Sequence, residues 1–203
     1  MGREYYRHTG YTRYVDFKKL DFVVRLCKKT LTRNNLKGLD IGCAEGDVTI
    51  PLASLGYNMI GFDISEENIK KANSKRVSKH NPMFFVGDAE NLGIFEKGIF
   101  DFVICSEVLE HVQNPKEVLN SINKISKKNA LLILTVPNGY GPYSLLNDHF
   151  RNKIVHHILP RIGKSGHVHS FTLNKIKKLI ADAGFDVMEV KHSDFISFLP
   201  TLV

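Results

Sequence analysis

The sequence predicts a doubly wound α/β domain built on a mostly parallel sheet. From about residue 37 onward, short apolar segments alternate with longer amphipathic ones, as strands alternate with helices around a parallel sheet. The strand-like segments are apolar along their whole length, which is typical of strands covered on both faces. Because ligands bind at the carboxyl ends of the strands in such folds, we expect the functional site at that edge.

The apolar segments and the stretches between them define the predicted elements. Strands are predicted at residues 37–42, 58–65, 83–90, 100–108, 129–137 and 185–192. Helices are predicted at residues 15–31, 47–55, 66–80, 115–128 and 172–184. Pro115 suits the first turn of its helix, where a missing N–H costs no hydrogen bond. Thr172 is the expected N-cap of the last helix, and Gly184 is expected to end it.

The composition is that of one globular domain. The chain has 203 residues, of which 43% are hydrophobic and 24% charged. It has no apolar run near the roughly 20 residues that span a bilayer, and its start lacks the apolar core of a signal peptide. Cys27, Cys43 and Cys105 are odd in number and widely spaced, which indicates reduced, buried thiols. These features predict a cytoplasmic protein.

The net charge of +7 is unevenly distributed. Residues 38–110 contain more acidic than basic side chains, whereas both flanking regions are basic. A basic surface favours an anionic partner, although scattered lysines also occur on ordinary solvated surfaces.

The segment "LDIGCAEGDVT", residues 39–49, is a strand that runs into a glycine-spaced turn and then a helix. Gly42, Ala44 and Gly46 allow a tight turn and a close approach of the backbone to a ligand. Asp63 and Asp88 end the next two predicted strands, where a carboxylate can bind ribose hydroxyls and meet an adenine edge. Together these residues predict a nucleoside ligand.

The acidic residues of the turn help to distinguish between the possible nucleoside cofactors. A nicotinamide cofactor would favour a glycine at Asp47. Its pyrophosphate would also be repelled by Asp40, Glu45 and Asp47. A cofactor with a sulfonium and an ammonium group is compatible with these carboxylates.

The chain resembles the class I S-adenosylmethionine-dependent methyltransferases over about residues 37–190. The resemblance is carried by "LDIGCAEG", "GFDIS", "VGDAENL", "FDFVICSEVLEHVQNP", "LLILTVPN" and "LIADAGFDV". It implies a Rossmann-like sheet of the seven-stranded type with an antiparallel last strand. Only "SDFISFLPTLV" remains to supply that strand, so we expect it to be atypical or shortened.

The resemblance also implies which residues bind S-adenosylmethionine. Asp40 and Gly42 are expected at the methionine end, Asp63 at the ribose, Asp88 and Ala89 at the adenine, and Ser106 and Glu107 beneath the cofactor. The full set of expected cofactor-binding residues is Asp40, Gly42, Cys43, Ala44, Gly46, Asp63, Ile64, Asp88, Ala89, Ser106 and Glu107.

The segment "SEVLEHV" supplies the candidate catalytic residues. Glu107, Glu110 and His111 are spaced to share one face of a helical turn. His111 and Glu107 are predicted to act in catalysis, with His111 as a base. With His169 from the later "HSF", the same residues are candidate ligands for a divalent metal, an alternative that we do not expect. A third interpretation is that Glu110 and His111 only stabilise the turn.

The chain divides into a predicted N-terminal helical cap, residues 1–36, and a cofactor-binding domain, residues 37–203. Within the domain, residues 138–170 are a predicted lid whose basic residues favour an anionic acceptor. Tyrosines interleaved with arginines near the N-terminus could cover the cofactor or stack on nucleic acid.

The predicted function is methyl transfer to a small-molecule acceptor, at oxygen. The motif "EVLEH" with a later "HSF" is similar to metal-dependent RNA 2′-O-methyltransferases, and "EHV" to the O-methyltransferases of ubiquinone biosynthesis. RNA methylation, metal-assisted or not, is therefore one alternative. The other is a cofactor-binding or partner subunit without activity. The acceptor and the oligomeric state are left open.

Overall fold

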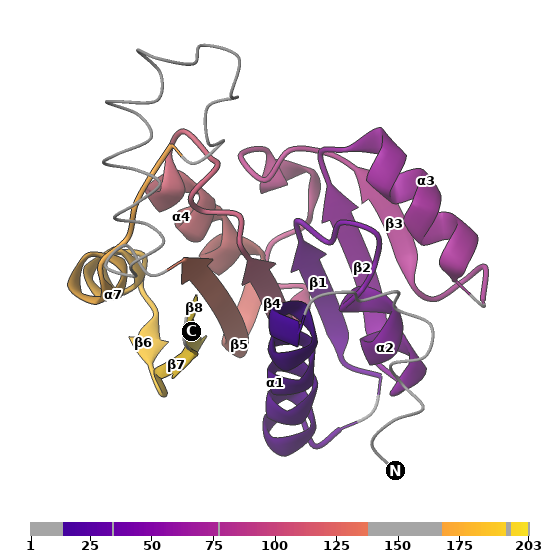
Figure 1. Ribbon diagram of the computed structural model, residues 1–203, viewed down its shortest axis with the longest axis horizontal. Helices are drawn as coiled ribbons and strands as arrows, with labels where there is room; N and C mark the ends of the chain where they lie inside the picture. The colour runs from indigo at the N-terminus through magenta and orange to yellow at the C-terminus, as the bar shows by residue number, and fades with distance from the viewer. Residues whose placement is uncertain (1–13, 34, 77, 138–167, 194–195, 203) are drawn as a thin grey trace.

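A computed structural model describes residues 14–33, 35–76, 78–137, 168–193 and 196–202. In these residues the strands form an eight-stranded sheet of order β3-β2-β1-β4-β5-β8-β6, with β7 also paired to β8 (Figure 1). The strands are β1 (Lys37–Ile41), β2 (Asn58–Asp63), β3 (Met83–Val86), β4 (Phe100–Ser106), β5 (Ser126–Pro137), β6 (Asp186–Val187), β7 (Lys191–Ser193) and β8 (Ile196–Leu202). The helices are α1 (Tyr14–Thr30), α2 (Thr49–Ser54), α3 (Glu66–Lys75), the 3₁₀ turn η2 (Leu92–Ile94), α4 (Pro115–Ile125) and α7 (Leu173–Asp182).

The five strands β1 to β5 are parallel, as the alternation of elements predicts. β1 lies at the centre, where Leu39 is in register with Ile60 of β2 and Val103 of β4. The predicted doubly wound α/β fold is confirmed.

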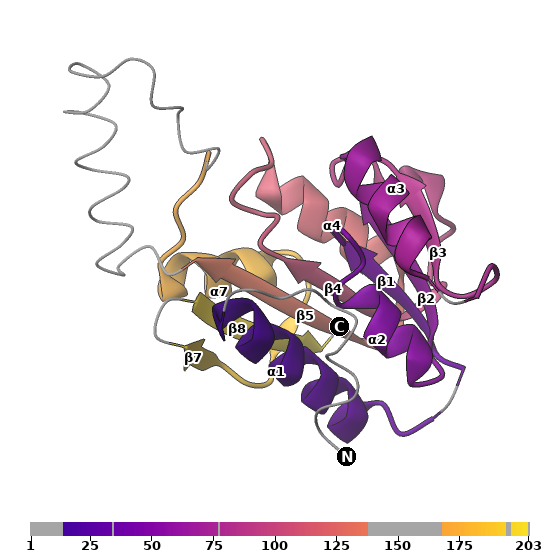
Figure 2. The same cartoon turned by 45° about the vertical axis from the view of Figure 1, so that its right-hand side comes forward.

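Helices cover both faces of the sheet, which explains why its strands are apolar throughout (Figures 1 and 2). On one face, residues of α1 and α2 pack against alternate strand residues such as Phe102 and Ile104, and α3 covers Phe84 on the same side. On the other face, residues of α4 and α7 pack against the intervening residues, Val103 and Cys105. The two hydrophobic cores hold the carboxyl ends of the strands at one edge.

The helix boundaries follow local signals in the sequence. The side chain of Thr172 accepts a hydrogen bond from the main-chain N–H of Lys175 and caps α7, while Pro115 begins α4 as predicted. Gly184 follows α7 with φ of +86°, a conformation that glycine adopts without strain. Helix α1 begins and ends one residue earlier than predicted, and α2 and α3 are shorter than predicted.

The C-terminal segment supplies the antiparallel last strand that the resemblance implies. β8 pairs with β5 along its whole length, from Ile196 opposite Pro137 to Leu202 opposite Leu131. The strand predicted at 185–192 is present as two short pieces, β6 and β7, which both pair with β8. Their registers differ by one residue because three residues on the β6–β7 side face two on β8, one of which is Pro200. The break lies beside Pro200, and proline has no N–H with which to donate a hydrogen bond to a sheet.

No helix among the described residues is both long and apolar enough to cross a membrane.

Candidate active site

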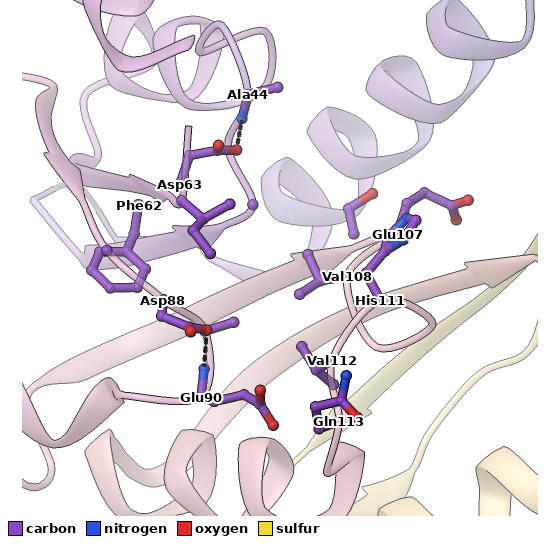
Figure 3. A pocket seen from close by; sticks show the side chains of 15 residues that line it. Ala44, Phe62, Asp63, Asp88, Glu90, Glu107, Val108, His111, Val112 and Gln113 are labelled. Carbon is purple, nitrogen blue, oxygen red and sulfur yellow. Dashed lines mark hydrogen bonds between the residues drawn. The ribbon is translucent and has the colours of Figure 1, made fainter. Parts of the chain in front are cut away.

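A cavity of about 530 Å³ opens at the carboxyl ends of β1, β2, β3 and β4 (Figure 3). This is the edge at which a doubly wound sheet binds its ligand. Residues that line it are Gly42, Ala44, Phe62, Asp63, Ile64, Gly87, Asp88, Ala89, Glu90, Ser106, Glu107, Val108, His111, Val112 and Gln113. In Figure 3, Asp63 and Asp88 lie on one side of the cavity, and Glu107 and His111 on the other.

The glycine turn after β1 is held against the end of β2. The main-chain N–H groups of Gly42 and Cys43 both donate to the carbonyl oxygen of Phe62, at 2.7 and 3.1 Å. Gly42 has φ of +70°, and a Cβ at this position would lie 2.4 Å from Cγ2 of Val108. Glycine is therefore required here both by the backbone conformation and by the wall of the cavity.

Asp63 at the end of β2 fixes the same turn. Its Oδ2 accepts a hydrogen bond of 2.8 Å from the main-chain N–H of Ala44, and its Oδ1 accepts one of 2.8 Å from Ser65. Only 9% of Asp63 is exposed, and the exposed part lines the cavity. Each carboxylate oxygen has a second lone pair, so Asp63 can still accept hydrogen bonds from ribose hydroxyls.

Asp88 follows β3 on the same side of the cavity. Its Oδ1 accepts a hydrogen bond of 2.9 Å from the main-chain N–H of Glu90, which shapes the turn that follows. Oε1 of Glu90 in turn accepts from the N–H of Asn114, ahead of α4. Asp88, Ala89 and Glu90 therefore form one continuous wall.

The opposite wall begins where β4 ends. Ser106 and Glu107 line the cavity, and both are hydrogen-bonded to the buried Thr135 of β5. Glu107 has φ of +57°, a left-handed conformation that is uncommon for a residue with a side chain. Such conformations cluster at functional sites, where surrounding contacts maintain them.

His111 lies further along this wall, with 47% of its side chain exposed. Its ring Nε2 is 3.9 Å from Oε1 of Glu110, whose side chain is 1% exposed. A base at this position can reach the cavity, and the buried side chain of Glu110 lies beside its ring.

The four metal-ligand candidates do not converge in the structure. Oε1 of Glu107 accepts from Thr135, and Nε2 of His169 is 3.1 Å from the main-chain oxygen of Gln113. Glu110 contacts the returning chain through its main-chain oxygen, which accepts from the N–H groups of Val168 and His169. In the described part of the chain, no group of three His, Cys, Asp or Glu side chains is arranged to hold a metal ion.

Three of the predicted cofactor-binding residues lie behind the cavity wall. Asp40 is 2% exposed, and its Oδ2 accepts a hydrogen bond of 2.6 Å from the hydroxyl of Thr49. Cys43 is 4% exposed, and burial raises the pKa of its thiol above the ordinary value. Gly46 makes room for Phe84, because a Cβ there would lie 2.8 Å from the ring. These residues can support the turn, while Gly42 and Ala44 line the cavity.

The acidic residues of the turn are neutralised outside the cavity. Lys75 of α3 forms ion pairs with Glu45 at 2.6 Å and with Asp47 at 3.5 Å, and Lys71 pairs with Glu45 at 3.3 Å. These lysines hold the pKa of the Glu45 carboxyl below its ordinary value. The repulsion of a pyrophosphate expected from Glu45 and Asp47 is therefore weakened by these ion pairs.

The charge of the cavity comes from other carboxylates. Its lining contains Asp63, Asp88, Glu90 and Glu107, and no lysine or arginine among the described residues. An acidic cavity repels a pyrophosphate and attracts a cation. The preference for a sulfonium cofactor thus has a structural basis, although not the one that the sequence indicated.

The sequence did not identify six lining residues. Phe62, Gly87, Val108 and Val112 resemble ordinary core or turn positions in the sequence, and Glu90 and Gln113 resemble surface residues. The sequence signal for Gly87 is a glycine directly before Asp88, near the end of a predicted strand. The structure gives its reason, because a Cβ there would lie 2.3 Å from the ring of Phe62. The predicted lid and the aromatic N-terminal segment lie, except for residues 14 and 168–170, outside the described residues.

Comparisons with known proteins identify the family of the chain. The sequence matches the model of a family described as a methyltransferase domain over residues 9–190. A ubiquinone biosynthesis O-methyltransferase of Rickettsia canadensis (strain McKiel) is 28% identical over 163 residues, which are 78% of this chain and 66% of the relative. The corresponding protein of Pelagibacter ubique (strain HTCC1062) is 33% identical over 121 residues, 58% of this chain and 48% of the relative. The chain spans about half to two thirds of the length of these relatives.

Solved structures show the same fold. Magnesium protoporphyrin IX methyltransferase of Synechocystis PCC 6803, solved with bound S-adenosylhomocysteine, has a TM-score of 0.72 at 23% identity, covering 95% of this chain and 89% of its own. A [4+2]-cyclase has a TM-score of 0.68 at 13% identity, covering 90% and 80%.

The chain therefore belongs to the methyltransferase-domain family. Its parallel sheet, antiparallel β8 and glycine turn are those of the class I S-adenosylmethionine-dependent methyltransferases, as the resemblance implied. The relatives named above give no support to the RNA alternative.

Proposed function

We propose that this protein transfers a methyl group from S-adenosylmethionine to an oxygen atom of a small-molecule acceptor. The observation that carries the proposal is the acidic cavity at the ends of the parallel strands, with Asp63 and Asp88 on one side and Glu107 and His111 on the other. The O-methyltransferase relatives support oxygen as the methylated atom.

The cavity residues fit the cofactor by their chemistry. Asp63 is assigned to the ribose hydroxyls, and Asp88 with Ala89 to the adenine. The backbone at Gly42 and Ala44 is assigned to the methionine end, since glycine at residue 42 lets the chain approach a ligand closely. When bound, the cofactor supplies a methyl group on a sulfonium, which is already activated for displacement.

The chain's own contribution is to position the acceptor and to take its proton. Orienting two reactants can account for much of the rate of a displacement. A hydroxyl acceptor must also lose a proton, and His111 is assigned as the base that accepts it. Glu110, whose Oε1 lies 3.9 Å from Nε2 of His111, is assigned to hold the ring in place.

Two finer assignments belong to this proposal. The basic residues between 138 and 167 favour an anionic acceptor by their charge. A cytoplasmic location is favoured by Cys27, Cys43 and Cys105, which are free and buried.

Turnover has to be tested separately from cofactor binding, because a [4+2]-cyclase shares this fold. The first experiment is calorimetric titration with S-adenosylmethionine and S-adenosylhomocysteine. The second measures S-adenosylhomocysteine formation with a panel of hydroxylated small molecules, beginning with phenolic intermediates of ubiquinone biosynthesis, with and without EDTA. Micromolar binding and acceptor-dependent turnover are expected. No binding of either compound would contradict the proposal, and binding without turnover on any acceptor would favour the non-catalytic alternative.

A further inference from the structure

Thr135 connects the two pocket residues at the end of β4. Its hydroxyl oxygen lies 2.9 Å from Oε1 of Glu107 and 2.8 Å from the hydroxyl oxygen of Ser106. Thr135 is fully buried in β5 and does not line the cavity itself. Its carbonyl oxygen also accepts a hydrogen bond of 3.0 Å from the N–H of Glu107. One buried residue thus contacts both the side chain and the backbone of Glu107.

The donors and acceptors in this chain of hydroxyls can occur in only one order. A carboxylate has no proton to donate, so Thr135 donates its single hydroxyl proton to Glu107. Thr135 then has no proton left for Ser106, so Ser106 donates to Thr135. The proton of Ser106 points into the protein, and only lone pairs of its oxygen remain for the cavity.

Glu107 likewise presents a hydrogen-bond acceptor. Oε1 is held by Thr135, and no described residue donates a hydrogen bond to Oε2. Glu107 has a positive φ of +57°, and its N–H donates to the carbonyl oxygen of Thr135. The wall at Ser106 and Glu107 therefore offers acceptors and no side-chain donor.

We propose that Thr135 is a positioning residue that makes Ser106 and Glu107 a subsite for a hydrogen-bond donor of the ligand. The matching chemistry is an N–H or O–H group, and a cationic ammonium fits best because Glu107 adds negative charge. Two ligands could supply it: the amino group of the cofactor or a hydroxyl of the acceptor. This inference rests on the proposed function, because it takes those two molecules as the ligands of the cavity.

Two variants of Thr135 test whether its hydroxyl group or only its shape is needed. Thr135→Val keeps the shape and removes the hydroxyl, whereas Thr135→Ser keeps the hydroxyl. Ser126→Ala is the matched control, because Ser126 is a buried hydroxyl at the other end of β5 that donates to Ile122. Melting curves and circular dichroism establish that each variant is folded. Ser106→Ala provides a second test at a partly buried position if Thr135→Val does not fold.

Two pairs of probes distinguish the source of the donor. The first pair is S-adenosylhomocysteine and its deamino analogue, which keeps the carboxylate but lacks the amino group. The second pair is catechol and 1,2-dimethoxybenzene, titrated into protein saturated with S-adenosylhomocysteine. Calorimetry gives a ratio of dissociation constants for each pair and each variant, without reference to turnover.

We expect the wild type to prefer the donor-bearing member of at least one pair by about tenfold, as for a hydrogen bond to a charged group. Thr135→Val is expected to lose that preference, with Thr135→Ser and Ser126→Ala retaining it. An effect on the first pair assigns the donor to the cofactor, and one on the second assigns it to the acceptor.

The proposal is overturned if the wild type prefers neither donor, if Thr135→Val discriminates as the wild type does, or if Thr135→Ser loses as much as Thr135→Val. For Ser106→Ala, a preference equal to that of the wild type would overturn it as well. A wild-type protein that binds no S-adenosyl compound would instead refute the proposed function, and this inference with it.

Discussion

The main-chain N–H of Ala44 donates a hydrogen bond of 2.8 Å to Oδ2 of Asp63, and this bond joins the glycine turn to the end of β2. Because Oδ1 of Asp63 accepts from Ser65, one carboxylate organises two backbone segments at the cavity. Asp63 therefore shapes the site as well as lining its cavity.

Replacing Asp63 with asparagine should weaken cofactor binding. Asparagine keeps the size of the side chain, but its NH₂ group cannot accept a hydrogen bond from a backbone N–H. We expect the affinity for S-adenosylhomocysteine, measured by calorimetry, to fall at least about tenfold. Asp182→Asn, at the exposed end of α7, is the control and should bind as the wild type does. Unchanged affinity of Asp63→Asn for S-adenosylhomocysteine would show that Asp63 does not contribute to cofactor binding.

Ala44→Gly should stabilise the protein. Ala44 has φ of +46°, where a Cβ costs about 1–2 kcal/mol and glycine does not pay that cost. Glycine loses more backbone entropy on folding, by about 0.5–1 kcal/mol, so a net gain of roughly 0.5 kcal/mol remains. Urea unfolding measures this change in the free energy of unfolding. Ala181→Gly in helix α7 should be destabilising, and a loss of stability in both variants would contradict the prediction.

Gly87→Ala should damage the side of the cavity to which we assign the adenine. The added Cβ would lie 2.3 Å from the ring of Phe62, which lines the same cavity. Overpacking of this kind costs about 1–3 kcal/mol, and moving the ring should also weaken S-adenosylhomocysteine binding. The matched control is Gly93→Ala, where no atom lies within 4 Å of the added group. Equal behaviour of the two variants in thermal melting and calorimetry would show that Phe62 has room to move.

His111→Gln should lower kcat by about 100-fold and leave cofactor affinity unchanged, as for loss of a general base. His80→Gln, at an exposed loop residue, is the control. A lower melting temperature with unchanged kcat would show instead that His111 only stabilises the turn. The turnover assay identified under the proposed function provides the measurement.

The stability should fall at alkaline pH because of buried thiols. Burial raises the pKa of Cys27 from 9.0 to about 12, and raises those of Cys43 and Cys105 in the same direction. Below pH 9 the thiols are protonated in both states, so their contribution to stability is fully present. Between pH 9 and about 12 the unfolded chain loses protons that the folded chain keeps, so stability is lost as pH rises. Cys27→Ala should reduce the slope of urea-derived stability by about 1.4 kcal/mol per pH unit. An unchanged slope would contradict the burial of a protonated thiol.

The parts of the fold that depend on local sequence were predictable. Strands β1 to β5, the capping by Thr172 and the turn at Gly42 follow from neighbouring residues. The division of the predicted 185–192 strand was not, because it depends on the register with β8.

The site shows the same limit. Asp63, Asp88 and Ser106 could be placed at one edge because parallel strands end together. Thr135 contacts Glu107 from 28 positions away, and Lys75 pairs with Glu45 from 30 positions away. Contacts between such distant residues leave no periodic pattern in one sequence.

The main-chain oxygen of Glu110 accepts hydrogen bonds from Val168 and His169, while β5 ends at Pro137. The chain thus leaves the sheet at Pro137 and is hydrogen-bonded to Glu110 again at Val168 and His169. Neither attachment involves a residue between these positions. We expect a segment of another length in place of residues 138–167 to leave both attachment points intact, because each is formed by residues outside that range. Under the proposed function, we expect the cofactor-lining residues to be separable from the segment whose charge favours an anionic acceptor.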